Sequence, residues 1–238
     1  MSKIEWTNKT WNPITGCTPI SEGCNNCYAK AMNKRFGEKW GNPDFKVKFH
    51  PERLDQPLKK KKPTLYFVCS MGDLFHYDVS YTQLEKIINI ISECKQHHFL
   101  VLTKRPQIMK SFFEVFAKEI KMPLNLWLGV TAENQKQADK RIPILLDITA
   151  AGHFISLEPL LGEVIPDLCN YGTANHSDIK VNIIKWVIAG KETGTGARPM
   201  KQEWIDKIRT QVEINRIPFF HKNDENFREV PKELERFF

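Results

Sequence analysis

The sequence predicts an α/β fold, a single domain built on a parallel sheet that forms a barrel or an open partial barrel. After residue 60, apolar β-branched stretches alternate with amphipathic stretches. Near-continuous apolar strands of this kind are typical of a buried parallel sheet with helical crossovers. We count about seven strands, which favours a barrel-like sheet over a flat doubly wound one. No change in composition marks a domain boundary, so residues 1–238 are expected to form one domain.

The expected elements follow in a regular order. The strands are predicted near 11–15 and at 64–70, 98–104, 124–130, 152–159, 183–190 and 217–222. Apolar residues at helical spacing predict helices between them, over 81–95, 106–120, 134–146 and 201–215. Pro106 stands at a favourable first position of its helix. The polar segment 162–182 interrupts the alternation and is expected to be a loop or a small insertion.

The composition points to a cytoplasmic protein with an anionic partner. No apolar run approaches the roughly 20 residues that span a bilayer, and the N-terminal stretch has no apolar core of a secretory signal. Thiols stay reduced in the cytoplasm, so the six cysteines indicate metal binding or chemistry before disulfides. The 35 Lys and Arg residues exceed the 28 Asp and Glu residues, and this net charge of +7 favours a nucleic acid or a phosphorylated small molecule.

Three cysteines stand close together in the segment 16–29, "GCTPISEGCNNCYA". Cys17, Cys24 and Cys27 have the spacing Cys-x6-Cys-x2-Cys and follow the first predicted strand. A structural zinc ion would need a fourth ligand, for which Cys69 and His50 are candidates. An iron–sulfur cluster is the other group that prefers thiolates. Three thiolates on a four-iron cluster leave one iron open to a substrate or cofactor.

Polar residues follow six of the predicted strands at the point where each strand ends. They lie in the segments 69–76, 103–106, 129–134, 156–162, 189–200 and 219–224. The carboxyl ends of the strands in a parallel barrel meet at one mouth, where active sites form. The sequence therefore predicts a concave polar site at this mouth.

Three cysteines after the first strand of a parallel β/α barrel resemble the radical S-adenosylmethionine enzymes. The resemblance implies a 4Fe-4S cluster on Cys17, Cys24 and Cys27, with S-adenosylmethionine on the open iron and a barrel of the radical SAM type. It also implies reductive cleavage of the cofactor to methionine and a 5′-deoxyadenosyl radical. The commonest spacing in that superfamily is Cys-x3-Cys-x2-Cys, so the first gap here is longer by three residues.

A longer resemblance covers nearly the whole chain. It rests on the motifs "WTNKTWNPITGCTPISEGCNNCYA", "HPERLDQPL", "SMGDLFH", "LTKRP", "WLGVTAENQ", "RIPILL", "SLEPLLG" and "ARPM". These look like the phage- and prophage-associated family of radical-SAM-like proteins of unassigned activity. The family typically has a glycine where this chain has Lys191, and a glutamine-tryptophan-glycine where this chain reads "NDEN" after Lys222.

The resemblance implies cofactor-binding roles for residues near the cysteines and at the strand ends. Tyr28 would lie near the adenine, although packing on the following helix is an alternative. Ser70 and Asp73 would accept hydrogen bonds from the methionine ammonium, and Asp73 could instead cap a helix. Glu133 and Asn134 would bind the ribose hydroxyls, with a helix cap as the alternative for Asn134.

Further strand-end residues complete the candidate site. Glu192 and Arg198 are expected to hold the cofactor carboxylate or a substrate phosphate, because an arginine fork binds anions through two hydrogen bonds. The candidate catalytic residues are Cys69, as a hydrogen donor, together with Lys104 and Glu158. The alternatives are burial for Cys69 and, for Glu158, an ion pair with Lys104 or the arginine that follows it.

The sequence thus predicts a radical S-adenosylmethionine enzyme with an electron donor such as flavodoxin or ferredoxin. A nucleic acid base or nucleotide is the expected substrate, to be repaired or modified, on the basis of the charge and the phage association. A non-catalytic nucleic-acid-binding protein with a structural zinc site is the alternative. No membrane partner is expected, and the sequence does not indicate an oligomeric state.

Overall fold

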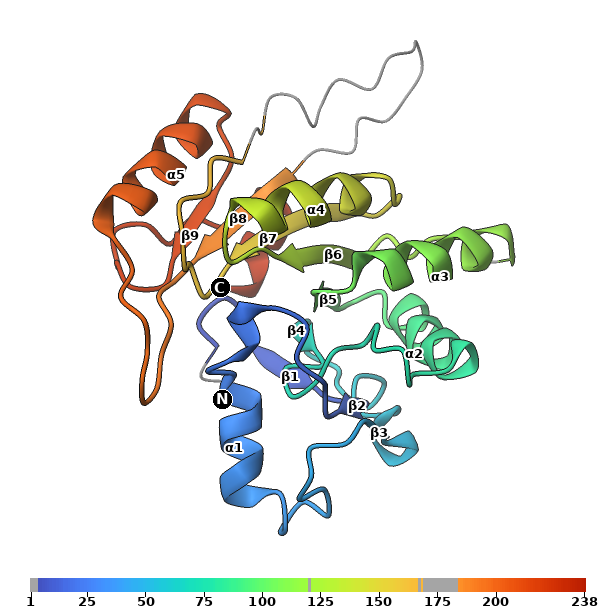
Figure 1. Ribbon diagram of the computed structural model, residues 1–238. Coiled ribbons are helices and arrows are strands. Elements are labelled where there is room, and N and C mark those ends of the chain that lie inside the picture. The colour runs from blue at the N-terminus through green and yellow to red at the C-terminus, as the bar shows by residue number, and fades with distance from the viewer. Residues whose placement is uncertain (1–3, 120, 167, 169–183) are drawn as a thin grey trace.

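A seven-stranded parallel sheet forms the centre of the molecule (Figure 1). The computed structural model describes residues 4–119, 121–166, 168 and 184–238. The strands lie side by side in chain order: β1 (Lys9–Trp11), β4 (Leu65–Val68), β5 (His98–Thr103), β6 (Leu126–Thr131), β7 (Gly152–Leu157), β8 (Ile184–Ala189) and β9 (Phe219–His221). Within the described residues β1 and β9 are the two ends of the sheet and do not pair, so the barrel is open.

Helices follow the strands and cover the outer face of the sheet (Figure 1). They are α2 (Tyr81–Glu93), α3 (Pro106–Glu119), α4 (Gln135–Leu146) and α5 (Gln202–Ile214). The first helix, α1 (Tyr28–Phe36), follows Cys27 and contributes no residue to the main core. Ser80 begins α2 with a capping box: its hydroxyl accepts from the Gln83 N–H, and the Gln83 side chain accepts from the Ser80 N–H. The apolar faces of α2–α5 pack on the outward side chains of the strands and form the main core.

A second apolar cluster fills the inner face of the sheet. It contains alternate residues of β4–β9, because successive side chains of a strand point to opposite faces. Leu234 and Phe237 of the short helix η4 (Lys232–Phe237) and Trp6 near the N-terminus complete it. Trp6, Leu234 and Phe237 therefore cover the inner face of the half-barrel. The part of this face that they leave uncovered lies toward the carboxyl ends of the strands.

The prediction of about seven parallel strands in chain order is confirmed, and the open form of the barrel is the one observed. The first strand was predicted as one segment but is divided. β1 joins the main sheet, whereas β2 (Ile14–Thr15) pairs with β3 (Lys48–Phe49) in a separate antiparallel pair. Most of the expected insertion at 162–182 lies outside the described residues. Among the described helices, none has the length and apolar character to cross a membrane.

Two glycines allow large rings to lie across the inner face. A Cβ at Gly129 of β6 would lie 2.5 Å from the Phe154 ring, and one at Gly152 of β7 would lie 2.6 Å from the Trp127 ring. Phe154 and Trp127 both belong to the inner cluster and are nearly inaccessible to solvent. Because real Cβ atoms do not approach aromatic rings this closely, the sequence at these positions is fixed by packing.

We predict that Gly129→Ala lowers the free energy of unfolding by about 1–3 kcal/mol, because the added methyl must displace the Phe154 ring. Urea unfolding gives this quantity directly. Gly162→Ala is the control, since its new Cβ would meet only the Asn134 Cβ at 3.4 Å. Equal stability of the two variants would contradict the packing argument.

Candidate functional site

The cysteine loop, residues 16–27, lies at the edge where the sheet strands end. It begins directly after β2 and leads into α1. Gly16 fixes its start, because the φ of Gly16 is +86° and a Cβ there would lie 1.9 Å from the Lys46 carbonyl oxygen. The Gly16 N–H donates to the Met71 carbonyl at 2.9 Å, which ties the loop to the segment after β4.

The first anchor of the loop is a buried ion pair between Asp73, which follows β4, and Arg105, which follows β5. The Arg105 Nη1 lies 2.8 Å from Asp73 Oδ2. The same guanidinium donates to the Thr18 carbonyl at 2.8 Å and lies 3.5 Å from the Cys17 Sγ. Thr103 Oγ1 and the Phe75 N–H both donate to Asp73 Oδ1. The pair therefore holds the beginning of the loop and brings a positive charge to Cys17.

The second anchor is the fully buried carboxylate of Glu133, which follows β6. Arg141 Nη1 lies 2.8 Å from Glu133 Oε2 and also donates to the Thr131 carbonyl at 2.7 Å. Glu133 Oε1 faces the Gly23 N–H of the loop at 3.4 Å. Desolvation acts to raise the pKa of Glu133, but a hydrogen bond from Ser21 and the Arg141 charge lower it overall. An ionised carboxylate thus fixes the middle of the loop.

The third anchor joins the loop to the segment after β8. Arg198 forms a bidentate pair with Glu192, in which its Nη2 lies 2.5 Å from Oε1 and its Nε lies 2.9 Å from Oε2. Asn26 of the loop donates to Glu192 Oε2 at 2.8 Å, and Arg198 Nη2 donates to the Glu22 carbonyl at 2.9 Å. Asn134 donates to the Glu22 carboxylate and also begins α4 as its N-cap.

Tyr28 closes the arrangement on the side of α1. Its ring is 47% exposed, yet its hydroxyl donates to the carbonyl of Ser70, a buried residue. Desolvation of this inward-turned hydroxyl raises the pKa of Tyr28. The Ser70 hydroxyl in turn donates to Asn12 Oδ1 at 3.2 Å. Tyr28 and Ser70 therefore fasten the end of the loop to the end of β4.

The three thiols of the loop are partly exposed, and all are free. Desolvation and the Asp73 carboxylate raise the pKa of Cys17, against the opposing effect of Arg105. Desolvation also acts on Cys24, but the Lys104 ammonium and hydrogen bonds within the loop lower its pKa overall. Lys104 and Arg105, which follow β5, thus both favour a thiolate in the loop, but only at Cys24 does the pKa fall overall.

The inner face of the half-barrel presents one further ion pair below this edge. Glu158 follows β7 and Lys222 follows β9, and Glu158 Oε1 lies 2.5 Å from Lys222 Nζ. Both side chains are about one quarter exposed. A Cβ at Gly190, after β8, would lie 3.4 Å from both of these side chains, so the glycine leaves room for them. The alternative for Glu158, an ion pair with Lys104 or Arg105, is not the pair observed, because Glu158 pairs with Lys222 and Arg105 with Asp73.

The structure brings most of the predicted site residues to the loop, but as its supports. Glu133 and Arg198 bond directly to the loop backbone. Asp73 acts through Arg105, and Glu192 through Arg198 and the Asn26 side chain. The helix-cap alternative for Asn134 is confirmed. Cys69 does not reach the site, because it is 3% exposed and lies in the outer core, where burial raises the pKa of its thiol.

Four residues that hold or face the site were not predicted from the sequence: Thr18, Asn26, Arg141 and Lys222. A usable signal existed for Arg141, which shares the helical spacing of the buried residues Ala138, Ile142 and Leu145. A charged residue on a buried helical face indicates a buried partner. No comparable signal marks Thr18 or Asn26, because polar residues in a loop need no explanation.

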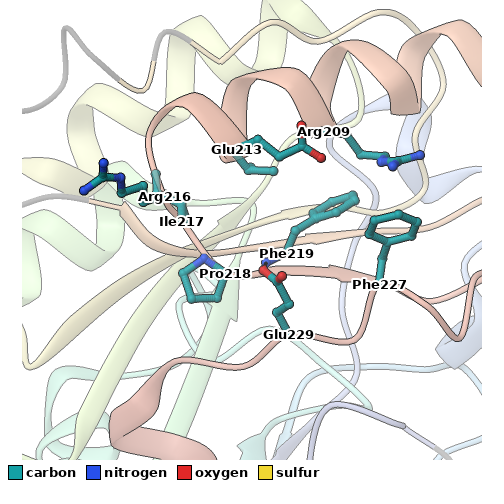
Figure 2. A pocket seen from close by; sticks show the side chains of 9 residues that line it. Arg209, Glu213, Arg216, Ile217, Pro218, Phe219, Phe227 and Glu229 are labelled. Atoms are coloured by element: carbon teal, nitrogen blue, oxygen red, sulfur yellow. Dashed lines mark hydrogen bonds between the residues drawn. The ribbon is translucent and has the colours of Figure 1, made fainter.

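Two cavities differ in their relation to the loop. One of about 340 Å³ lies between the end of α5 and the start of β9, lined by residues such as Arg209, Phe219 and Phe227 (Figure 2). It lies at the opposite edge of the sheet and contains no cysteine or histidine. A second cavity of about 210 Å³ contains Ile20 of the loop together with Lys104 and Arg105. We place the functional site at the loop, because the thiols and the ion pairs converge there.

A family model described as "Protein of unknown function (DUF5131)" matches residues 1–235. The chain belongs to this family. No curated protein and no solved structure matches the chain significantly. The DUF5131 description assigns no activity, so membership of the family transfers no function to this chain.

The donor set of this DUF5131 protein was tested against the two groups that its cysteines suggest. Among the described residues, no three His, Cys, Asp or Glu side chains are gathered closely enough to form a metal site. Neither candidate for a fourth zinc ligand belongs to such a group among the described residues: Cys69 lies in the core, and both ring nitrogens of His50 bond to Thr15 and Glu52. The loop carries three free thiols, with Arg105 beside Cys17 and the Lys104 charge acting on Cys24, and thiols are the ligands that an iron–sulfur cluster requires.

We predict that Arg141→Met lowers the free energy of unfolding by about 3–5 kcal/mol, because it leaves the buried Glu133 carboxylate without its partner. The neighbouring Lys140→Met should change it by less than about 0.5 kcal/mol, since Lys140 is exposed. Urea unfolding of the two variants is the measurement. A stable Arg141→Met protein would show that this pair does not hold the loop.

The third anchor predicts a dependence on pH. Hydrogen bonds from Arg198 lower the pKa of Glu192 from 4.5 to about 2, so its ionised form is favoured in the folded state. The resulting stability is present above pH 4.5 and is lost as the pH falls toward about 2. The difference in unfolding free energy between the wild type and Glu192→Gln should therefore be constant from pH 7 to 5 and shrink below. A difference as large at pH 3 as at pH 7 would contradict this.

Proposed function

We propose that this protein is a radical S-adenosylmethionine enzyme that uses Cys17, Cys24 and Cys27 to hold a 4Fe-4S cluster. The observation that carries the proposal is the loop itself. It carries three free, partly exposed thiols, with Arg105 beside Cys17 and the Lys104 charge acting on Cys24. Because the thiols are not gathered as they stand, loading requires the side chains to turn toward one another. The bound cluster would supply reductive cleavage of S-adenosylmethionine to methionine and a 5′-deoxyadenosyl radical.

The residues around the loop would act mainly by positioning. The three arginine–carboxylate pairs bond to the loop backbone at 18, 22 and 23, so they would set where the thiolates lie. Lys104 and Arg105 would offset the negative charge that thiolates bring to this edge. Asp73 and Glu133, expected to bind the cofactor directly, would serve the loop instead, because their carboxylates already accept hydrogen bonds from the protein.

The inner face would receive the substrate. Its lower part is filled by the aromatic cluster, so a bound molecule would lie toward the strand ends, next to Glu158 and Lys222. These two groups could orient a polar substrate or hold a proton at the Glu158 carboxylate or the Lys222 ammonium. A nucleic acid base or nucleotide is the substrate that we favour, given the net charge of +7 and the phage-associated resemblance. A flavodoxin or ferredoxin in the cytoplasm would supply the electron.

We predict that anaerobically reconstituted protein binds about four irons per chain and releases 5′-deoxyadenosine when S-adenosylmethionine and a reductant are added. Replacement of Cys17, Cys24 or Cys27 by serine should abolish both. Cys94→Ala is the matched control, because Cys94 is buried at the end of α2, away from the loop.

Iron analysis, the visible absorption spectrum and chromatography of the nucleoside are the measurements. One zinc ion per chain with no bound iron would overturn the proposal in favour of a structural zinc protein. Four irons without cleavage of S-adenosylmethionine would overturn the radical chemistry and leave a cluster enzyme with a different small molecule.

A further inference from the structure

The cavity of about 210 Å³ beside the cysteine loop is lined by groups that donate hydrogen bonds. It lies where α3 and α4 begin, with Ile20 of the loop on one side. Its other lining residues are Lys104, Arg105, Gln107, Ile108, Gln137, Lys140 and Arg141. Lysine and arginine side chains only donate, and the two glutamine amides can also donate. No carboxylate lines the cavity.

The positive charge of this cavity is only partly neutralised. Arg105 and Arg141 are paired with Asp73 and Glu133 behind the wall, and both arginines are almost fully buried. Lys104 and Lys140 form no ion pair with any described residue. The cavity therefore keeps the charge of two ammonium groups, with two more guanidinium groups fixed in its wall.

The amide side chains of the cavity are also free to bind a ligand. Neither the Gln107 nor the Gln137 side chain is engaged with another described group. α3 starts at Pro106, so the N–H groups of its first turn add a favourable potential for an anion. The cavity thus offers several donors and no fixed acceptor, which suits an oxyanion with several acceptor oxygens.

We propose that this cavity is a phosphate subsite that binds a phosphoryl group of the substrate. A phosphoryl group matches the lining because it combines negative charge with several acceptor oxygens in a small volume. The cavity is smaller than the roughly 300 Å³ at which pockets begin to hold whole drug-sized ligands, so it fits an anionic group better than a complete nucleotide. The group would lie directly behind the cysteine loop.

The role of this subsite in substrate binding rests on the proposed function. The subsite adds to that function one group that the substrate would carry, a phosphoryl group. The phosphoryl group could belong to a nucleic acid backbone or to a small phosphorylated molecule. Binding can be measured without reductant and without S-adenosylmethionine. Failure of the radical chemistry and failure of the subsite are therefore separate results.

Inorganic pyrophosphate and a fluorescein-labelled single-stranded oligonucleotide are the probes, each with the full-length protein purified anaerobically. Isothermal titration measures pyrophosphate binding, and fluorescence anisotropy measures the oligonucleotide. We expect Lys140→Gln to weaken pyrophosphate binding about tenfold, because it removes one charge-assisted contact. Lys136→Gln is the matched control, since Lys136 is exposed on the same helix but does not line the cavity.

The two sources of phosphate give different results, and each supports the subsite. If the oligonucleotide occupies the cavity, pyrophosphate displaces it and Lys140→Gln weakens both probes. If the ligand is a small molecule, only pyrophosphate binding responds to Lys140→Gln. The proposal is overturned if pyrophosphate does not bind the wild type, or if Lys136→Gln weakens its binding as much as Lys140→Gln does.

Discussion

Three arginine–carboxylate pairs hold the cysteine loop against the edge of the sheet, and the position of the candidate site depends on them. Asp73 and Arg105 follow neighbouring strands, β4 and β5, whereas Glu133 and Arg141 both follow β6, and Glu192 and Arg198 both follow β8. A loop of this length would otherwise keep much of its conformational freedom, which costs free energy on folding. The pairs offset this cost because one group of each also bonds to the loop backbone: Arg105, Glu133 and Arg198.

The order of the strands explains why the thiols, the Glu158–Lys222 pair and the basic cavity all lie at one edge of the sheet. Parallel strands in chain order end at the same side, so the sheet alone brings the residues after β4–β9 together. The outer core and the inner aromatic cluster are both apolar, and they fix the sheet without contributing reactive groups. Thiols on the loop, the Glu158–Lys222 pair on the inner face and the basic cavity behind the loop therefore share one rigid support. Sites on such supports keep their geometry better than sites on free loops.

The fold was largely predictable, because apolar runs alternating with amphipathic helices leave few arrangements other than a parallel sheet. The division of the first strand was not predictable, since it depends on Ile14 and Thr15 pairing with Phe49 and Lys48 far along the chain. The gathering of polar strand ends was also predictable from topology. Which carboxylate meets which arginine was not, because a pattern of strand ends gives proximity but no side-chain direction. The side-chain direction of Cys69 was likewise not predictable, and the alternative of burial is the one observed, because Cys69 belongs to the outer core.

Hydrogen–deuterium exchange of the cysteine loop tests most directly whether these pairs fix it. Arg198→Met removes the least buried pair, so the sheet should survive the change. We expect the amides between residues 18 and 26 to exchange at least tenfold faster than in the wild type, while those of β5 and β6 stay protected. Lys201→Met, an exposed neighbour with one surface pair, should leave the loop unchanged. Unaltered exchange of the loop in Arg198→Met would contradict the account.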